Sequence, residues 1–293
     1  MDLWRTMYEE NRAPLPAGDF STVFAPQLAA IARAFPSRAP DTTPDHVLTW
    51  ATTNIQPYLA EVCRRLLLPG SGIEGGEHLE ALIKRARDGH ACMLCLNHRS
   101  NLDVPTLCTL LADAGQGELF EQLIWIAGRK LYEDVGRTWT LVQACNHVLV
   151  SPRSWLHAEH TEEELHQAHQ LNIAAHRVIH DLRHRGYAFA LFPSATRLRP
   201  GDASTAEAIE ETDSYLKHFE FMLLGHIDGC TMPVSKDRDM LHETPRLDRV
   251  RYRFGRVEPT QQWRETAARR HLGCDQKTAS ALAIMEDIQA LSH

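Results

Sequence analysis

The chain has 293 residues with a hydrophobic content of 43% and a charged content of 24%, which suits one large globular domain or one domain plus a smaller one. A formal net charge of −7 argues against a nucleic-acid-binding protein, because phosphate backbones attract basic surfaces. No stretch approaches the roughly 20 apolar residues that span a bilayer, the start lacks a secretory apolar region, and the seven scattered Cys do not suggest a disulfide framework.

These features predict a cytoplasmic protein, in which any contact with a membrane is peripheral docking at its inner face. Residues 1–75 are predicted to form a small N-terminal helical domain interrupted by Pro-rich joints. Its longest helical pattern runs from Asp45 to Leu68, with a break near Pro57. The segment 69–76, PGSGIEGG, is the clearest linker, and residues 76–293 are predicted to form the second domain.

In the second domain the sequence alternates between helical and strand patterns. The predicted helices include 77–89, 103–115, 161 to about 185, and two at the C-terminus. The predicted strands have the sequences ACMLCL, QLIWIAG, HVLVS, YAFALFP, GCTMPVS and RVRYRFG. This alternation predicts an α/β fold with a mixed, mostly parallel sheet flanked by helices. Ligands on such sheets bind beyond the carboxyl ends of the strands, where the loops after ACMLCL and YAFALFP lie.

The first of these loops, NHRSNLD, holds a candidate catalytic pair. His98 follows a strand that is predicted to be buried, and Asp103 begins the next helix, as its N-cap residue with Pro105 in the first turn. The carboxylate can fold back onto the ring N–H, fix the tautomer and raise the basicity of the other nitrogen. Since no Ser or Cys lies in a nucleophile elbow, the simpler role is a base that acts directly on a substrate hydroxyl. The alternative is that Asp103 only caps its helix and His98 only bonds loop backbone.

The second loop, LFPSATRLRPGD, holds a candidate phosphate site. Arg197 and Arg199 can grip a phosphate with paired N–H donors. Ser194 and Ala195 are small, so the backbone there can approach a ligand closely. The alternative is a solvated loop.

The order and spacing of these motifs resemble those of a known enzyme family across about residues 77–260. NHRSNLD resembles the N-H-x-x-x-x-D block of the glycerolipid acyltransferases, and FPSATRLRPGD resembles their phosphate-gripping block. TMPV, 231–234, resembles a later Pro-containing strand, and the segment from IWIAGRK to VLVSPRS is similar to the middle block. The greatest resemblance is to the soluble glycerol-3-phosphate 1-O-acyltransferases of plastids and some bacteria, which have a small N-terminal helical domain on an α/β domain.

The resemblance implies transfer of a fatty acyl group from acyl carrier protein or acyl-coenzyme A to the sn-1 hydroxyl of glycerol 3-phosphate, with no metal or cofactor. His98 is similar to the family's base and Asp103 to its orienting acid. The basic residues implied for the phosphate are Arg197, Arg199 and Arg153. Further residues implied for substrate binding are Arg129, Lys130 and Ser194. Ser194-Ala195 stands where many membrane-bound relatives have Glu-Gly, which points to the soluble branch.

Other interpretations stay open at this stage. The acceptor could be lysophosphatidate, since its phosphate needs the same grip, or the chain could be a non-catalytic lipid- or carrier-binding relative. The His-rich helix 161–185 could hold a metal between His176 and His180, as in a metallohydrolase, although a partly solvated flank is favoured. The basic strip 246–256 is either the solvated face of a strand or a docking site for an acidic partner or a membrane surface.

One further motif, the C-x-x-C of Cys92 and Cys95, lies in the strand ACMLCL. An odd separation in a strand sends the two side chains to opposite faces of a sheet. The motif therefore predicts two core residues rather than a metal or redox pair.

Overall fold

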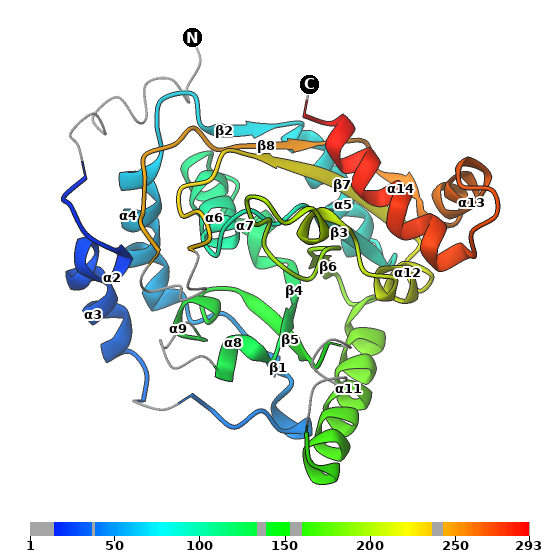
Figure 1. The fold of residues 1–293 in the computed structure, drawn as a ribbon, viewed down its shortest axis with the longest axis horizontal. Helices are drawn as coiled ribbons and strands as arrows, with labels where there is room; N and C mark the ends of the chain where they lie inside the picture. The colour runs from blue at the N-terminus through cyan, green and yellow to red at the C-terminus, as the bar shows by residue number, and fades with distance from the viewer. Residues whose placement is uncertain (1–14, 37–38, 134–138, 153–159, 236–242, 293) are drawn as a thin grey trace.

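The computed structural model of the chain describes residues 15–36, 39–133, 139–152, 160–235 and 243–292. In this part of the chain one nine-stranded sheet has the strand order β1-β5-β4-β6-β3-β7-β8-β2, with β9 paired to β7 (Figure 1). The strands are β1 (Leu48–Thr49), β2 (Gly72–Glu74), β3 (Cys92–Leu96), β4 (Leu123–Gly128), β5 (Asn146–Val150), β6 (Ala188–Leu191), β7 (Phe221–Asp228), β8 (Arg251–Phe254) and β9 (Glu258–Pro259). The adjacent strands β5, β4, β6, β3 and β7 are parallel to one another. Strand β1 pairs antiparallel with β5, and β8 and β9 pair antiparallel with β7. The predicted mixed, mostly parallel sheet is confirmed.

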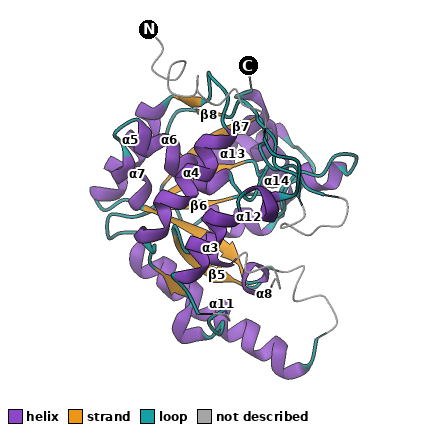
Figure 2. Ribbon diagram, turned by 90° about the vertical axis from the view of Figure 1, so that its left-hand side faces the viewer, coloured by secondary structure: helices purple, strands orange, loops and turns teal. Residues whose placement is uncertain are grey.

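Helices cover both faces of this sheet, as Figure 2 shows. One face carries α5 (Gly76–Arg87), α6 (Asp103–Asp113) and α7 (Gly117–Glu121), with α4 (Gln56–Leu66) against α6. The other face carries α11 (Glu162–Leu182), α12 (Glu211–Leu216), α13 (Thr260–Arg270) and α14 (Gln276–Ala290). Short helices are α2 (Phe20–Val23), α3 (Ala25–Arg33), α8 (Lys130–Glu133) and α9 (Trp139–Val142), and 3-10 turns cover Pro44–His46, Thr53–Ile55 and Ala203–Ala206. None of the helices in the described ranges has the length and apolar character to cross a membrane.

Strand β3 lies at the centre of the sheet, and all of its residues are buried. Cys92, Leu94 and Leu96 pack under the helices of one face, whereas Met93 and Cys95 pack under those of the other. Burial on both faces explains why the strand is apolar without alternation. The predicted division of Cys92 and Cys95 between the two faces is confirmed, and both thiols are free.

The predicted helix from Asp45 to Leu68 is wrong in its first half. Residues 44–55 form two 3-10 turns around β1, and α4 begins at Gln56 with Pro57 in its first turn. A proline fits there because the first turn of a helix leaves its N–H groups unpaired, so Pro57 starts the helix instead of breaking it. The N-terminal segment also supplies β1 and β2 to the common sheet. A division of the chain into two domains near residue 75 stays a prediction.

The predicted strand GCTMPVS is also wrong, because the strand at this point is β7, which precedes it. Gly229 follows β7 with a φ of +81°, and a Cβ there would lie 2.2 Å from the carbonyl oxygen of Arg249. Only glycine fits both conditions, so the chain leaves the sheet at this residue. The predicted helix from Thr161 to about Arg185 is confirmed as α11, with Thr161 and Glu164 forming a capping box.

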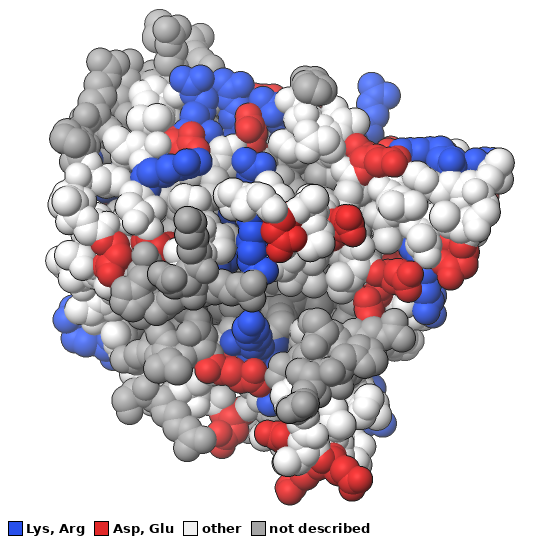
Figure 3. Space-filling model, viewed as in Figure 1, with Lys and Arg blue, Asp and Glu red and all other residues white. Residues whose placement is uncertain are grey.

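The basic strip 246–256 contributes β8 to the sheet, between β7 and the edge strand β2. Arg253 pairs with Glu74 at 2.9 Å, Arg251 lies 3.7 Å from the same carboxylate, and Arg246 lies 3.3 Å from Asp248. Figure 3 shows this gathering of Lys and Arg over β2 and β8, with acidic side chains among them. Most of the positive charge is balanced locally, which favours a solvated face over a docking site for an acidic partner.

A buried polar cluster lies behind β5. His147 is fully buried, its Nδ1–H donates to the Cys145 carbonyl at 2.9 Å, and its Nε2 accepts from the Tyr132 hydroxyl at 2.7 Å. The amide of Gln143 donates to the same hydroxyl at 2.6 Å. This arrangement satisfies a neutral imidazole, and burial lowers the pKa of His147 to about 4.

The neutral His147 should make the fold sensitive to acid. Its folded pKa lies below the unfolded value near 6.5, so the stability it contributes is complete above that pH and is lost as the pH falls toward 4. Over this interval the wild type should lose up to about 3 kcal/mol more unfolding free energy than a His147→Leu variant, measured by urea denaturation. Parallel pH profiles for the two proteins would contradict this expectation.

Candidate active site

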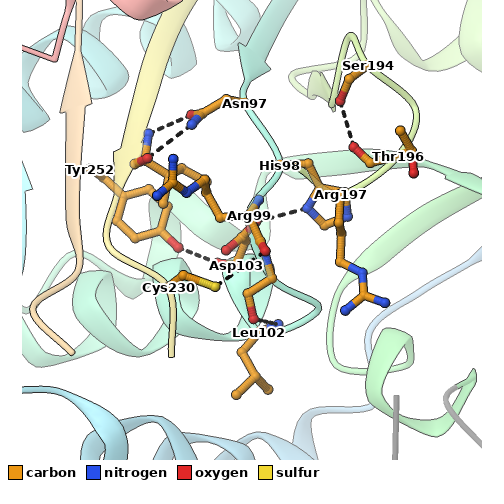
Figure 4. A network of polar contacts seen from close by, with 12 residues as sticks. Asn97, His98, Arg99, Leu102, Asp103, Ser194, Thr196, Arg197, Cys230 and Tyr252 are labelled. Atoms are coloured by element: carbon orange, nitrogen blue, oxygen red, sulfur yellow. Dashed lines mark hydrogen bonds and ion pairs between the residues drawn. The ribbon is translucent and has the colours of Figure 1, made fainter. Parts of the chain in front are cut away.

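The loop after β3 is fixed to the neighbouring strand by an amide side chain. The Nδ2 of Asn97 donates to the Ile227 carbonyl at 3.0 Å, and its Oδ1 accepts from the Ile227 N–H at 2.6 Å (Figure 4). These two bonds continue the pairing of β3 with β7 beyond the last strand residue. The position of the next residue, His98, is therefore set by the sheet.

His98 and Asp103 form the predicted pair. The Nδ1–H of His98 donates to Oδ2 of Asp103 at 2.9 Å, so the ring nitrogen Nε2 is the one left without a proton in the neutral form. The same Oδ2 accepts from the N–H groups of Arg99 at 2.7 Å and Ser100 at 2.9 Å. Asp103 is only 4% exposed, so its charge is stabilised by these donors and little by water.

The predicted capping role of Asp103 is wrong. Leu102 is the N-cap residue of α6, and Asp103 is the first residue of the helix. Its carboxylate accepts from the two amides of the preceding loop, because the loop turns back over the start of the helix. The pairing with the imidazole, which the sequence left as one of two alternatives, is present in the geometry.

Buried groups support this pair from behind. The hydroxyl of Tyr252 donates to the backbone carbonyl of Asp103 at 2.6 Å. Burial, together with the nearby carboxylate, raises the pKa of Tyr252 well above its ordinary value, so the hydroxyl stays a neutral donor. The thiol of Cys230 donates to the Arg99 carbonyl at 3.4 Å, and burial raises its pKa to about 11.

The face of the imidazole is held by an aromatic stack. The rings of His98 and Phe192 lie 3.9 Å apart between centroids, with an interplanar angle of 7°. Phe192 in turn contacts Trp125, with centroids 5.3 Å apart. Asp103 fixes the rotation of the imidazole in its plane and Phe192 fixes its tilt. Among the described residues, Nε2 of His98 has no partner, and the residue lines a cavity.

The loop after β6 brings the predicted phosphate site against this pair. The N–H of Leu198 donates to the His98 carbonyl at 2.8 Å, which ties the two loops together. Ala195 has a φ of +50°, a left-handed conformation that costs a non-glycine residue about 1–2 kcal/mol. The hydroxyl of Ser194, a predicted substrate contact, donates to the Thr196 carbonyl at 2.7 Å and so shapes this turn.

The two predicted phosphate-binding arginines differ in their partners. Arg197 donates through one terminal nitrogen to both carboxylate oxygens of Glu243, at 2.7 and 2.8 Å. In the described part of the chain the guanidinium group of Arg199 has no partner, and its Nε is buried without a hydrogen bond. A buried unpaired guanidinium N–H is costly, so this site favours an anionic ligand.

The residues of the middle block have separate places. Arg129 donates to Glu133 at 2.7 Å, one turn away, and its guanidinium is therefore paired. Lys130 is exposed and lines the same cavity as His98. Arg153 lies outside the described residues.

The cavity has a volume of about 1270 Å³, and its lining combines charged and apolar side chains. The charged and polar groups include His98, Arg197 and Arg199. The apolar part of the lining includes Leu59, Val104, Pro105, Phe120, Leu141 and Cys145. The cavity therefore offers donors for an anion and apolar surface for an alkyl chain.

The histidines of α11 were the alternative site. His176 lines the cavity and stacks on Tyr215 with centroids 5.8 Å apart, and burial followed by the nearby Lys217 lowers its pKa. The His180 side chain is 69% exposed beside Asp181. Within the described ranges no three His, Cys, Asp or Glu residues gather as metal ligands.

Residues 73–220 match the family model described as Acyltransferase. This match covers just over half of the chain and includes the His98–Asp103 pair and both loop arginines. No curated protein matches the chain.

The three contacts on Oδ2 of Asp103 predict different outcomes for two substitutions. Asp103→Asn can place its amide oxygen where Oδ2 lies and keep the loop, so its unfolding free energy should stay within about 1 kcal/mol of the wild type. Asp103→Ala leaves the amides of Arg99 and Ser100 without an acceptor, at about 1–3 kcal/mol each. Urea denaturation of both variants measures the difference, and equal losses would contradict the geometry.

Proposed function

Because the chain belongs to the acyltransferase family, we propose that it transfers a fatty acyl group from an acyl thioester to the sn-1 hydroxyl of glycerol 3-phosphate. The observation that carries the proposal is that one cavity is lined by His98, by apolar side chains and by Arg199, whose guanidinium has no partner among the described residues. The reaction needs a base, an anion site and room for an acyl chain, and these three features supply them.

The acceptor binds in the cavity at His98, Arg197 and Arg199. Its phosphate is held by Arg199 and by those N–H groups of Arg197 that Glu243 leaves free. Arg153, Arg129 and Lys130 are retained in the proposal as further substrate contacts predicted from the sequence. Anchoring the phosphate presents the far hydroxyl to Nε2 of His98, so that the reacting groups meet in an orientation that favours reaction.

The acyl chain of the donor lies against the apolar part of the cavity lining. Each CH₂ group moved from water into such surroundings contributes about 0.8 kcal/mol, which suits a long chain. The thioester carbonyl is then placed near the base, between the anion site and the apolar lining. The donor is acyl carrier protein or acyl-coenzyme A, since both present the same thioester.

The chemical step uses the free nitrogen of His98. Nε2 removes the hydroxyl proton as the oxygen attacks the thioester carbon, and a tetrahedral oxyanion forms. The Asp103 carboxylate stabilises the imidazolium. The carbon–sulfur bond then breaks, and His98 returns the proton to the leaving thiolate. Asn101 and Val104 line the cavity, and their backbone N–H groups have no partner in the described chain, so we take these amides as the candidate oxyanion donors.

The proposal predicts that purified protein releases free thiol from an acyl thioester when glycerol 3-phosphate is added. His98→Ala should keep the affinity for glycerol 3-phosphate, measured by calorimetry, and lose turnover by a factor of about 10³ or more. The base contributes mainly to the reaction barrier, so binding and turnover should separate.

A panel of donors and acceptors decides between the candidate activities. Thiol release with lysophosphatidate alone would replace the proposed acceptor, and no release with any pair would favour a non-catalytic relative. Near-normal turnover by His98→Ala would remove the residue from its role.

The proposed role of Arg199 predicts a change in the affinity for the acceptor. Arg199→Ala should raise the dissociation constant of glycerol 3-phosphate at least about tenfold, since charge-assisted hydrogen bonds contribute about 1.5–3 kcal/mol. Arg269→Ala removes an exposed guanidinium of α13, outside the cavity, and serves as the matched control. Unchanged acceptor affinity in Arg199→Ala would exclude this residue from the phosphate site.

A further inference from the structure

Glu243 is a buried carboxylate that no sequence motif singled out. Its side chain is 0% exposed, and both of its oxygens accept from NH1 of Arg197, at 2.7 and 2.8 Å. Its backbone carbonyl accepts from the N–H of Phe20, the first residue of α2, at 2.9 Å. Glu243 therefore joins the N-terminal helices to the loop that carries the predicted phosphate site.

This contact uses only part of the guanidinium group. NH1 contacts both carboxylate oxygens of Glu243, whereas Nε and NH2 of Arg197 have no partner in the described part of the chain. These two groups form the edge that can bind an anion bidentately. Figure 4 shows the Arg197 side chain extending away from the His98–Asp103 pair. With NH1 fixed, the free edge has one orientation.

We propose that Glu243 is a positioning residue that holds Arg197 ready for the phosphate of the acceptor. The identity of the acceptor in this inference rests on the proposed function. The positioning role of Glu243 rests on its ion pair with Arg197. An arginine side chain loses about 2 kcal/mol of rotamer entropy when it is fixed. Glu243 fixes it before the ligand arrives, so less of this cost falls on binding.

Glu243 has two opposing effects on the binding of an anion. Their balance decides whether removing its charge raises or lowers the dissociation constant of phosphate. Positioning of Arg197 strengthens phosphate binding, whereas a negative charge beside the site weakens it. Arg199 lies in the same loop and cavity without such a carboxylate, so the two arginines are not equivalent. If positioning prevails, removing the charge of Glu243 weakens binding of the anion.

The experiment measures the affinity of Glu243→Gln for inorganic phosphate and for glycerol 3-phosphate by calorimetry, with steady-state kinetics in parallel. Both dissociation constants should rise about five- to tenfold. The kcat should stay within about twofold and the KM for the thioester should not change. Glu207→Gln is the matched control, because it removes a carboxylate from the same cavity where no contact with Arg197 exists. It should leave the phosphate affinity unchanged.

Repeating the substitution of Glu243 in an Arg197→Ala protein distinguishes positioning of Arg197 from a purely structural role of Glu243. In Arg197→Ala protein, Glu243→Gln should cause no further rise in the dissociation constant of phosphate, because the side chain to be positioned is absent. An equal rise in both backgrounds, or tighter binding by Glu243→Gln alone, would overturn the proposal. If Glu243→Gln does not fold, Glu243→Asp replaces it, and its shorter side chain must weaken phosphate binding in the same way.

The outcome is independent of turnover. Inorganic phosphate binding needs no thioester, so a wild type that binds phosphate through Glu243-dependent Arg197 without any thiol release would end the proposed function and keep this inference. Normal turnover by the wild type, together with an unchanged phosphate affinity in Glu243→Gln, would keep the proposed function and end this inference.

Discussion

The candidate site depends on one buried carboxylate. Asp103 is almost completely removed from water, and a charge in that position must be compensated by hydrogen bonds. Two loop amides and the imidazole of His98 supply them on a single oxygen atom. The shape of the loop after β3, the tautomer of His98 and the direction of its free nitrogen all follow from this requirement.

The parallel sheet converts this local arrangement into a site. Because β3 and β6 are parallel neighbours, the loops that follow them leave the same edge. The bond from Leu198 to the His98 carbonyl and the stack of Phe192 on the imidazole join these loops directly. The base and the guanidinium groups are thus held by the same pair of strands, so their separation is a property of the fold.

The two arginines of the cavity differ in whether their charge is paired, and this difference affects how they can bind an anion. Arg197 is already paired with Glu243, whereas Arg199 has a buried nitrogen with no partner among the described residues. A site made of two unpaired guanidinium groups would carry a large repulsion in the absence of ligand. One paired and one unpaired group reduce that repulsion and still leave donors for an anion. The same cavity is also lined by apolar side chains, and charged interactions are stronger where apolar groups lower the local dielectric.

The sequence by itself determined the α/β alternation, the buried strand β3, the helix α11 and the residues His98, Asp103, Arg197 and Arg199 as candidates. These features are local: apolar runs, periodicity and short spacings set them. The end of β7 at Asp228, the start of α4 at Gln56 and the role of Asp103 in its loop were decided by tertiary contacts. Glu243 and Phe192 also acquired their places in this way. Their partners lie far away in the chain or across a turn, and no local pattern can encode which distant groups a fold brings within 3 or 4 Å.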